Sequence, residues 1–302
     1  MIVLSGGTGT PKLIRGLRRL IPDEEITVIV NTAEDIVVSG SYVSPDIDTV
    51  LYLFSGQLDD TKWWGIRNDT LYTNRVLKNL GLNEKLALGD ADRATCIFRS
   101  ELMKEGKSLT EATRELSLRS GIKAEILPMC DEKVDSMILT PQGLIHFQDF
   151  WVGAHGEPEV IEVRSIGQKE AKPTREVLSA LDSQENVLIG PSNPITSIGP
   201  ILALKGMRKI LSTKNVIAVS PIIGSAPVSG PAGKLMTACG FPVSSYGVAR
   251  CYEDILDIMV IDERDTADNT DFRVRVERYD TMMTSIEKSE ALAGFLMGLF
   301  GI

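Results

Sequence analysis

The chain has 302 residues, of which 43% are hydrophobic and 24% charged, which is typical of a globular protein and excludes a disordered or collagen-like one. Its net charge of -9 argues against nonspecific binding to nucleic acid or to an anionic membrane. Four cysteines stand far apart, and with two histidines they form no zinc-ligand pattern. We expect reduced thiols and a cytoplasmic protein, because no signal peptide or membrane-spanning stretch is evident.

The first residues predict a strand, a glycine-rich turn and the start of a helix. The apolar run 1–4 leads into Ser5-Gly6-Gly7-Thr8-Gly9-Thr10, and Pro11 opens the helix. Glycines let the backbone turn tightly and approach a ligand, and the free N–H groups of a first helical turn attract an anion. The loop indicates a phosphate site, although it matches neither the P-loop nor the dinucleotide-binding pattern, and packing alone is the alternative explanation.

A second strand and an acidic segment follow. The β-branched run 26–30 ends in Asn31-Thr32-Ala33-Glu34-Asp35, as a buried parallel strand would, and completes a βαβ unit. The segment Ser44-Pro45-Asp46-Ile47-Asp48-Thr49 then precedes an apolar run that predicts a helix, which Asp46 or Asp48 could cap.

Residues 85–170 are predicted to form an inserted segment that covers the active site. Apolar spacing predicts a helix over 94–104, and Ser108-Leu109-Thr110-Glu111 is a capping box for a second helix. Alternation then predicts a partly antiparallel extension, with strands over 124–127, 137–139, 144–152 and 160–163.

The last third of the chain returns to strands that end in loops of small residues. The run 187–189 leads into Gly190-Pro191-Ser192-Asn193-Pro194, and the run 216–219 leads into the loop 220–231. A helix is expected from about residue 232, a strand over 257–261 and an amphipathic helix over 284–300. The whole pattern predicts a single α/β domain, 1–302, with a three-layer, doubly wound, mainly parallel Rossmann-like sheet.

Three of the predicted strands end in such loops, and these loops gather at the carboxyl edge of an open parallel sheet. Their backbone N–H groups and hydroxyls suit a diphosphate, with three ordinary turns as the alternative. The candidate nucleotide-binding residues are Gly6, Gly7, Thr8, Gly9, Thr10, Lys12, Ser192, Asn193, Ser220, Gly224 and Ser225.

Carboxylates form the second candidate group. Beside a diphosphate, Asp35, Asp46 and Asp48 are candidate Mg²⁺ ligands, because this ion accepts a few carboxylates together with phosphate oxygens and water. Asp46 and Asp48 are two residues apart, and side chains at that spacing converge only in a turn or an extended loop. One carboxylate could instead position or deprotonate an attacking hydroxyl, and helix caps or solvated turns are the alternative roles.

The segments 5–13, 31–35, 44–49, 88–92 and 190–194 together resemble the CofD family, in this order and at these intervals. Ser44 to Thr49 is the most specific of them. The resemblance implies a homodimeric, Mg²⁺-dependent transferase that moves 2-phospho-L-lactate from lactyl-2-diphospho-5′-guanosine to the ribityl hydroxyl of the deazaflavin Fo. It releases GMP and forms coenzyme F-420-0. A phosphoenolpyruvyl donor is an open alternative, because the two groups differ by one double bond.

The resemblance also assigns roles to residues of this chain. Asp46 and Asp48 become the candidate catalytic residues. Family members often carry a basic residue where this chain has Ala87, so only a main-chain contact is expected there. Adjacent tryptophans at 63 and 64 offer a face for a flat heterocycle, with core packing as the alternative. The residues expected near Fo are Asp48, Trp63, Ala87, Leu88, Gly89, Asp90 and Asp92.

Two other functions are alternatives to this transferase. A related bacterial regulatory family shares the glycine-rich start, so a non-catalytic nucleotide-sugar-binding regulator is the main alternative. The segments 46–48 and 88–92 have a role only if a second substrate binds, which favours the enzyme. An NAD-dependent oxidoreductase is disfavoured by the spacing of the first loop and by Asn31, which stands where an acidic residue is expected.

Overall fold

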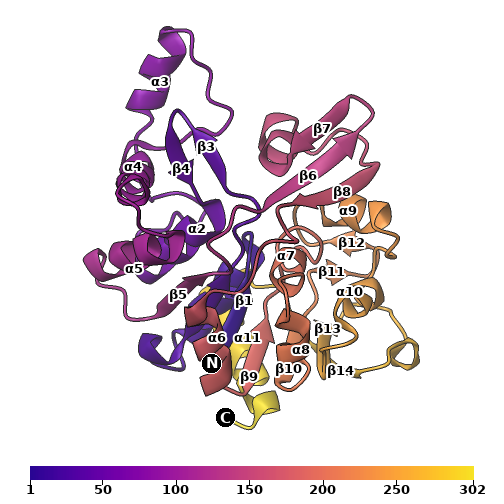
Figure 1. Ribbon diagram of the computed structural model, residues 1–302. Helices are drawn as coiled ribbons and strands as arrows, with labels where there is room; N and C mark the ends of the chain where they lie inside the picture. Colours follow the sequence, from indigo (N-terminus) through magenta and orange to yellow (C-terminus); the bar gives the residue numbers. More distant parts are fainter.

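The computed structural model describes residues 1–302 and is built on a central seven-stranded sheet with helices on both faces (Figure 1). Every pair of neighbouring strands in this sheet is parallel, as the sequence predicted. In spatial order the strands are β14 (Arg275–Tyr279), β13 (Ile258–Asp262), β10 (Asn215–Val219), β9 (Asn186–Ile189), β1 (Ile2–Ser5), β2 (Thr27–Val30) and β5 (Glu125–Pro128).

The two faces of the sheet pack against two separate groups of helices, because successive side chains of a strand point to opposite faces. Val3 of β1 packs into one apolar core, whereas Ile2 and Leu4 pack into the other. The first core contains residues of α1 (Gly9–Leu17), α2 (Pro45–Phe54), α5 (Leu109–Arg119) and α11 (Ile286–Phe300). The second contains residues of α6 (Arg175–Ser183), α7 (Gly199–Leu202), α8 (Met207–Leu211), α9 (Ala232–Ala238) and α10 (Ser245–Tyr252).

The order of the strands reverses beside β1. The chain first builds outward from β1 to β2 and β5, and later adds β9, β10, β13 and β14 on the other side of β1. In open α/β sheets the crevice at such a reversal, outside the carboxyl ends of the strands, is where ligands bind. Here the glycine-rich loop follows β1, and the loop that begins at Gly190 follows β9.

Two groups of smaller elements stand at one end of the molecule, on opposite sides of it in Figure 1. One comprises β3 (Ile36–Val38), β4 (Ser41–Val43), α3 (Tyr72–Asn79) and α4 (Asp90–Lys104). The other is the antiparallel sheet of β6 (Asp135–Thr140), β7 (Gly143–His146) and β8 (Glu162–Ile166). The inserted segment expected over 85–170 also contains β5 of the central sheet, so it comprises two excursions separated by that strand.

The strand predicted over 144–152 is wrong in its second half. β7 ends at His146, and Asp149–Gly153 form a π-helix (η2). Phe147 and Phe150 are both buried in a small core with Ile138 and Leu235. Residues three apart point to opposite faces of a strand but to the same side of a helical turn, so burial of both phenylalanines favours the helical conformation.

The remaining elements are short. They are the 3-10 helices η1 (Asp23–Glu25) and η3 (Asn269–Asp271) and the two-residue strands β11 (Ile222–Ile223) and β12 (Ala226–Pro227). The capping box predicted at Ser108 and Glu111 is present at the start of α5. None of the helices combines the length and apolar character needed to cross a membrane.

Close packing of α1 against α11 leads to a stability prediction. A Cβ atom at Gly16 would lie 2.1 Å from the carbonyl oxygen of Ser289, so Gly16→Ala must push the two helices apart. We expect a loss of about 1–3 kcal/mol in the free energy of unfolding, measured with urea. Gly298→Ala in α11 is the control, because nothing lies within 4 Å of its added Cβ. Equal stability of the two variants would contradict the packing described.

Candidate active site

A cavity of about 880 Å³ opens where the loops after β1, β9 and β10 meet. Its volume lies at the upper end of the range for small-molecule sites, which leaves room for a nucleotide and a second substrate. It brings together most of the predicted site residues: Gly7, Thr8, Gly9, Lys12, Asp46, Asp48, Trp63, Ala87, Leu88, Asp92, Ser192, Asn193 and Ser220.

The other predicted residues do not line the cavity, and several of them hold its walls together. Thr10 and Ser192 share a hydrogen bond of 2.7 Å between their hydroxyl oxygens, and the Ser192 hydroxyl also donates to the carbonyl of Gly6. A Cβ at Gly9 would lie 1.9 Å from the carbonyl oxygen of Pro191, so only glycine allows this approach of the two loops. The residues outside the lining are Gly6, Thr10, Asp35, Gly89, Asp90, Gly224 and Ser225.

Asp90 was expected near the acceptor, and the structure gives it a different role. Its carboxylate accepts hydrogen bonds from the Thr70 hydroxyl and from the backbone N–H groups of Tyr72 and Thr73, which lower its pKa. Asp90 therefore anchors the start of α3. Gly224 was expected near the nucleotide, but it lies in the β11–β12 hairpin outside the cavity lining. Its N–H donates to the Asp265 carboxylate at 3.1 Å.

Trp63 lies on the side of the cavity that Lys12 of α1 lines. It is 9% exposed, has a left-handed backbone with φ of 65°, and lies beneath two cations. Lys12 Nζ is 5.4 Å and Arg15 Cζ 4.6 Å from the centre of its ring. The ring thus supports Lys12, whose pKa is lowered by burial and by Arg15. The tryptophans of the lining that have exposed ring surface are Trp64 and Trp151.

Asp46 connects the glycine-rich loop to the end of β2. Its Oδ1 accepts the N–H of Gly7 at 2.7 Å, and its Oδ2 accepts the side-chain amide of Asn31 at 2.9 Å. Burial raises the pKa of Asp46 to about 6, although both hydrogen bonds favour the charged form. Glu34, buried beside it, has a pKa raised well above its usual range by burial and by the charge of Asp46.

Glu34 and Asp46 are two buried carboxylates of the cavity lining. Both line the cavity beside the glycine-rich loop, and neither forms an ion pair with a basic side chain. Asp35 lies behind them, where its Oδ1 accepts the Ser44 hydroxyl at 2.7 Å and its buried Oδ2 has no partner. Burial raises the pKa of Asp35 as well. A bound Mg²⁺ would offset this concentration of buried negative charge.

Asp48, also predicted as a metal ligand, is already paired with a cation. Both of its carboxylate oxygens accept hydrogen bonds from the fully buried guanidinium of Arg99, with Nη1 3.2 Å from Oδ2. Asp46 and Asp48 lie in the first turn of α2, where side chains two residues apart point in different directions. The two carboxylates therefore do not converge, and the acidic and thiol ligand atoms that lie within 4.8 Å of one another are those of Asp48, Asp92 and Cys96.

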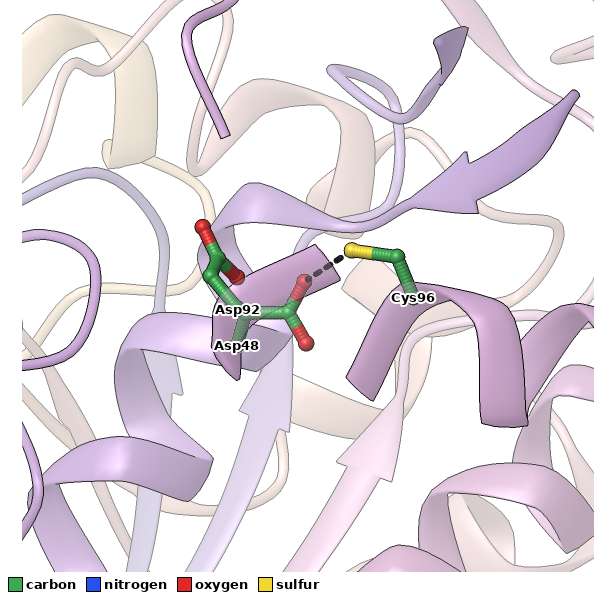
Figure 2. Close-up of side chains that lie close together, drawn as sticks. All are labelled: Asp48, Asp92 and Cys96. Atoms are coloured by element: carbon green, nitrogen blue, oxygen red, sulfur yellow. Dashed lines mark hydrogen bonds between the residues drawn. The ribbon is translucent and has the colours of Figure 1, made fainter. Parts of the chain in front are cut away.

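Asp92 of α4 lies next to Asp48 in the lining of the cavity. Figure 2 shows Cys96 and Asp92 on either side of the Asp48 carboxylate, with the Cys96 sulfur 4.0 Å from Asp48 Oδ2. The phenolic hydroxyl of Tyr52 donates to Asp92 Oδ1 at 2.7 Å. Burial and the charge of Asp48 raise the pKa of Asp92 to about 6.

Sequence reasoning missed several residues of the lining. Glu34 belongs to the segment 31–35, but the sequence pattern indicated no role for it. The side-chain amide of Gln148 donates to the backbone carbonyl of Glu34 at 3.2 Å, and Gln148 directly precedes the unpredicted π-helix. Residues 281–284 reach the cavity because Asp262 accepts the N–H and hydroxyl of Thr281, at 2.9 and 2.8 Å. No pattern in this polar linker indicated its position.

The buried ion pair of Asp48 and Arg99 predicts a large stability change. Arg99→Met leaves a buried carboxylate without a counter-charge, so we expect the free energy of unfolding to fall by about 3–5 kcal/mol at pH 7.5. Arg119→Met is the control, because Arg119 pairs with Glu115 on the surface and its loss is expected to cost less than about 1 kcal/mol. Similar urea midpoints for the two variants would contradict a dependence of Asp48 on Arg99.

The raised pKa of Asp92 predicts a pH-dependent stability. At pH values between the ordinary aspartate pKa and about 6, Asp92 keeps a proton in the folded chain that it releases in the unfolded chain. Stability therefore falls as the pH rises through this window. Asp92→Asn removes the effect, and we expect the loss of unfolding free energy between pH 4.5 and 7.5 to be about 2 kcal/mol smaller in the variant. Identical pH dependence in both proteins would contradict the assignment.

Comparison with known proteins gives matches along almost the whole chain. The family described as 2-phospho-L-lactate transferase CofD matches residues 1–292. A protein named 2-phospho-L-lactate transferase from Methanosarcina acetivorans is 60% identical over 99% of both chains. One of the same name from Methanosarcina mazei is 58% identical over 99% of this chain and all of its own, and one from Methanocaldococcus jannaschii 44% identical over 96% and 95%.

A solved structure agrees with the fold. A protein of the UPF0052 family from Bacillus halodurans matches with a TM-score of 0.69 over 98% of both chains, and at 15% identity this likeness shows the α/β architecture alone. The family itself is shown by the sequence matches, which include the glycine-rich loop, the segment 44–49 and the strands that carry the cavity. The chain belongs to the CofD family of 2-phospho-L-lactate transferases.

Proposed function

We propose that this chain transfers 2-phospho-L-lactate from lactyl-2-diphospho-5′-guanosine to the ribityl hydroxyl of Fo, releasing GMP and forming coenzyme F-420-0 with the help of Mg²⁺. The observation that carries the proposal is one continuous cavity with two chemically different ends. A glycine-rich loop at the sheet reversal forms one end, and Asp48, Asp92 and Tyr52 form the other. The name of the relatives, 2-phospho-L-lactate transferase, supports the same reaction.

The diphosphate of the donor fits the end of the cavity that the glycine-rich loop forms. Gly7 has a φ of 57° and Gly9 touches the next loop, so the backbone lies close to the cavity and offers N–H groups at the start of α1. Lys12 adds a positive charge, and Ser192 and Asn193 add polar groups from the loop after β9. The buried Asn193 Nδ2 has no hydrogen-bond acceptor in the protein, which leaves it available to a phosphate oxygen.

Mg²⁺ would be held by Asp46 and Glu34, beside the N–H of Gly7. When bound, the ion would neutralise charge on the diphosphate and help orient it. Without a ligand, Asp46 already fixes the glycine-rich loop through Gly7 and the end of β2 through Asn31. The protein therefore supplies the positions and charges on which a phosphoryl transfer depends, and no covalent step by a side chain is required.

The acceptor fits the opposite end, where the lining is both apolar and acidic. Ala87 and Leu88 belong to the lining, as do Trp64 and Trp151, whose rings are partly exposed. Such surfaces suit a flat heterocycle, whereas the acidic pair Asp48 and Asp92 suits hydroxyl groups. A regulator that bound only a nucleotide sugar would have no use for this second end, which is why the transferase is preferred. Homodimerisation and a cytoplasmic location stay predictions.

A two-part assay tests the proposal. Wild-type protein is incubated with Fo, Mg²⁺ and lactyl-2-diphospho-5′-guanosine, and product and GMP are measured by mass spectrometry. The enolpyruvyl donor and a metal-free sample run in parallel. We expect transfer that requires Mg²⁺, with faster turnover of the lactyl donor. Nucleotide binding without turnover of either donor would support the regulator instead.

Asp48→Ala separates the two ends of the cavity. The hydrogen bonds of Asp48 go to Arg99 and not to the glycine-rich loop. We therefore expect transfer to fall by about 10²-fold while GDP affinity changes less than about threefold. Circular dichroism checks that the variant is folded, because Arg99 loses its buried partner. Glu101→Ala, an exposed position on α4, is the control and should leave both unchanged. An equal loss of transfer and GDP binding would contradict the assignment of Asp48 to the acceptor end.

A further inference from the structure

The two carboxylates at the acceptor end differ in what they are free to do. Both oxygens of Asp48 accept hydrogen bonds from Arg99, so its charge is balanced and its lone pairs are occupied. Asp92 has one protein partner, the Tyr52 hydroxyl on Oδ1, and its Oδ2 accepts no hydrogen bond. Oδ2 of Asp92 keeps some accessible surface. Because Asp92 lines the cavity, this oxygen faces the open space.

The first turn of α2 joins Asp92 to the phosphate end of the cavity. Asp46 in that turn holds the N–H of Gly7, and Asp48, two residues later, lies beside Asp92. The glycine-rich loop and Asp92 also line the same cavity, so a ligand that spans it would meet phosphate-binding groups on one side and a free carboxylate oxygen on the other. This is the arrangement that a hydroxyl needs to attack a phosphoryl group while losing its proton.

We infer that Asp92 is the general base of the reaction, with Oδ2 accepting the proton of the acceptor hydroxyl. This inference rests on the proposed function. The O–H bond of the acceptor breaks and its proton moves to Asp92 Oδ2. The oxygen forms a new bond to the phosphorus that carries the lactyl group, and the bond from that phosphorus to the bridging oxygen breaks. That electron pair leaves with GMP, and Asp92 later returns its proton to water.

The surroundings of Asp92 suit this role. The groups that face it are Asp48 with its partner Arg99, Tyr52, Asp69 and Cys96. Burial and Asp48 raise its pKa to about 6, so at neutral pH it is mostly ionised and yet a stronger base than an ordinary aspartate. The pKa of Tyr52 is raised well above its usual range by burial and by Asp48, which keeps Tyr52 a hydrogen-bond donor.

Two variants test the inference through pH profiles of kcat and kcat/KM for transfer to Fo. Asp92→Asn keeps the shape of the side chain and its contact with Tyr52, so folding and GDP affinity should be retained. We expect kcat to fall about 10²- to 10⁴-fold and the acidic limb of kcat/KM near pH 6 to disappear. Tyr52→Phe removes a hydrogen bond that favours the charged form, so the acidic limb should move to higher pH.

Glu101→Gln on the exposed face of α4 is the matched control and should change neither kcat nor the profile. The inference is overturned if Asp92→Asn keeps kcat within tenfold of wild type, or if its acidic limb stays where it was. A purely structural Asp92 would lower GDP affinity or unfold the protein instead. Absence of transfer by the wild type would refute the proposed function itself. Normal transfer by Asp92→Asn would refute only the role of Asp92 as the base.

Discussion

The buried carboxylate of Asp46 is the contact on which the site depends. By accepting the N–H of Gly7 and the amide of Asn31, it ties the loop after β1, the end of β2 and the first turn of α2 into one unit. Each of these three segments belongs to a different part of the fold, and the cavity lies where they meet. An apolar residue at this position would leave two buried donors without acceptors, which costs about 1–3 kcal/mol for each group.

The site carries more buried acid than stability alone would favour. Glu34, Asp35, Asp46 and Asp92 all have raised pKa values with burial as the first cause, and among the buried acids of the cavity only Asp48 has a buried guanidinium as its partner. Such groups oppose folding when they ionise, because a charge in a protein interior is poorly solvated. In the proposed function their retention is explained by a cation at Glu34 and Asp46 and by a free carboxylate at Asp92.

Much of the architecture could be predicted because its signals are local. Short β-branched runs followed by glycine-rich or small-residue loops indicated the parallel strands β1, β2, β9 and β10, and the reversal beside β1 explains why their loops share a cavity. The placement of residues 281–284 could not be predicted in this way, because it depends on hydrogen bonds from Thr281 to Asp262, which lies on another segment. The π-helix after β7 was hidden for a similar reason, since the burial of Phe147 and Phe150 becomes visible only when β6 and α9 pack against them.

The segment 44–49 shows how the local conformation assigns different roles to identical side chains. From the sequence, Asp46 and Asp48 could share one ion if the chain ran through a turn. In the structure they occupy the first turn of α2, where each residue rotates about 100° from the one before it, so the two carboxylates point away from each other. Asp46 faces the glycine-rich loop, and Asp48 faces Arg99 and Asp92.

This divergence has a consequence for catalysis. One helical turn bears Asp46, which holds the glycine-rich loop, and Asp48, which lies beside Asp92, so a small shift of α2 would move both groups together. Arg99 holds Asp48 from α4, and Asp92 lies on the same helix, so the acceptor end is fixed by packing between two helices rather than by a mobile loop. Groups carried on rigid elements keep the geometry that in-line transfer between two bound substrates requires.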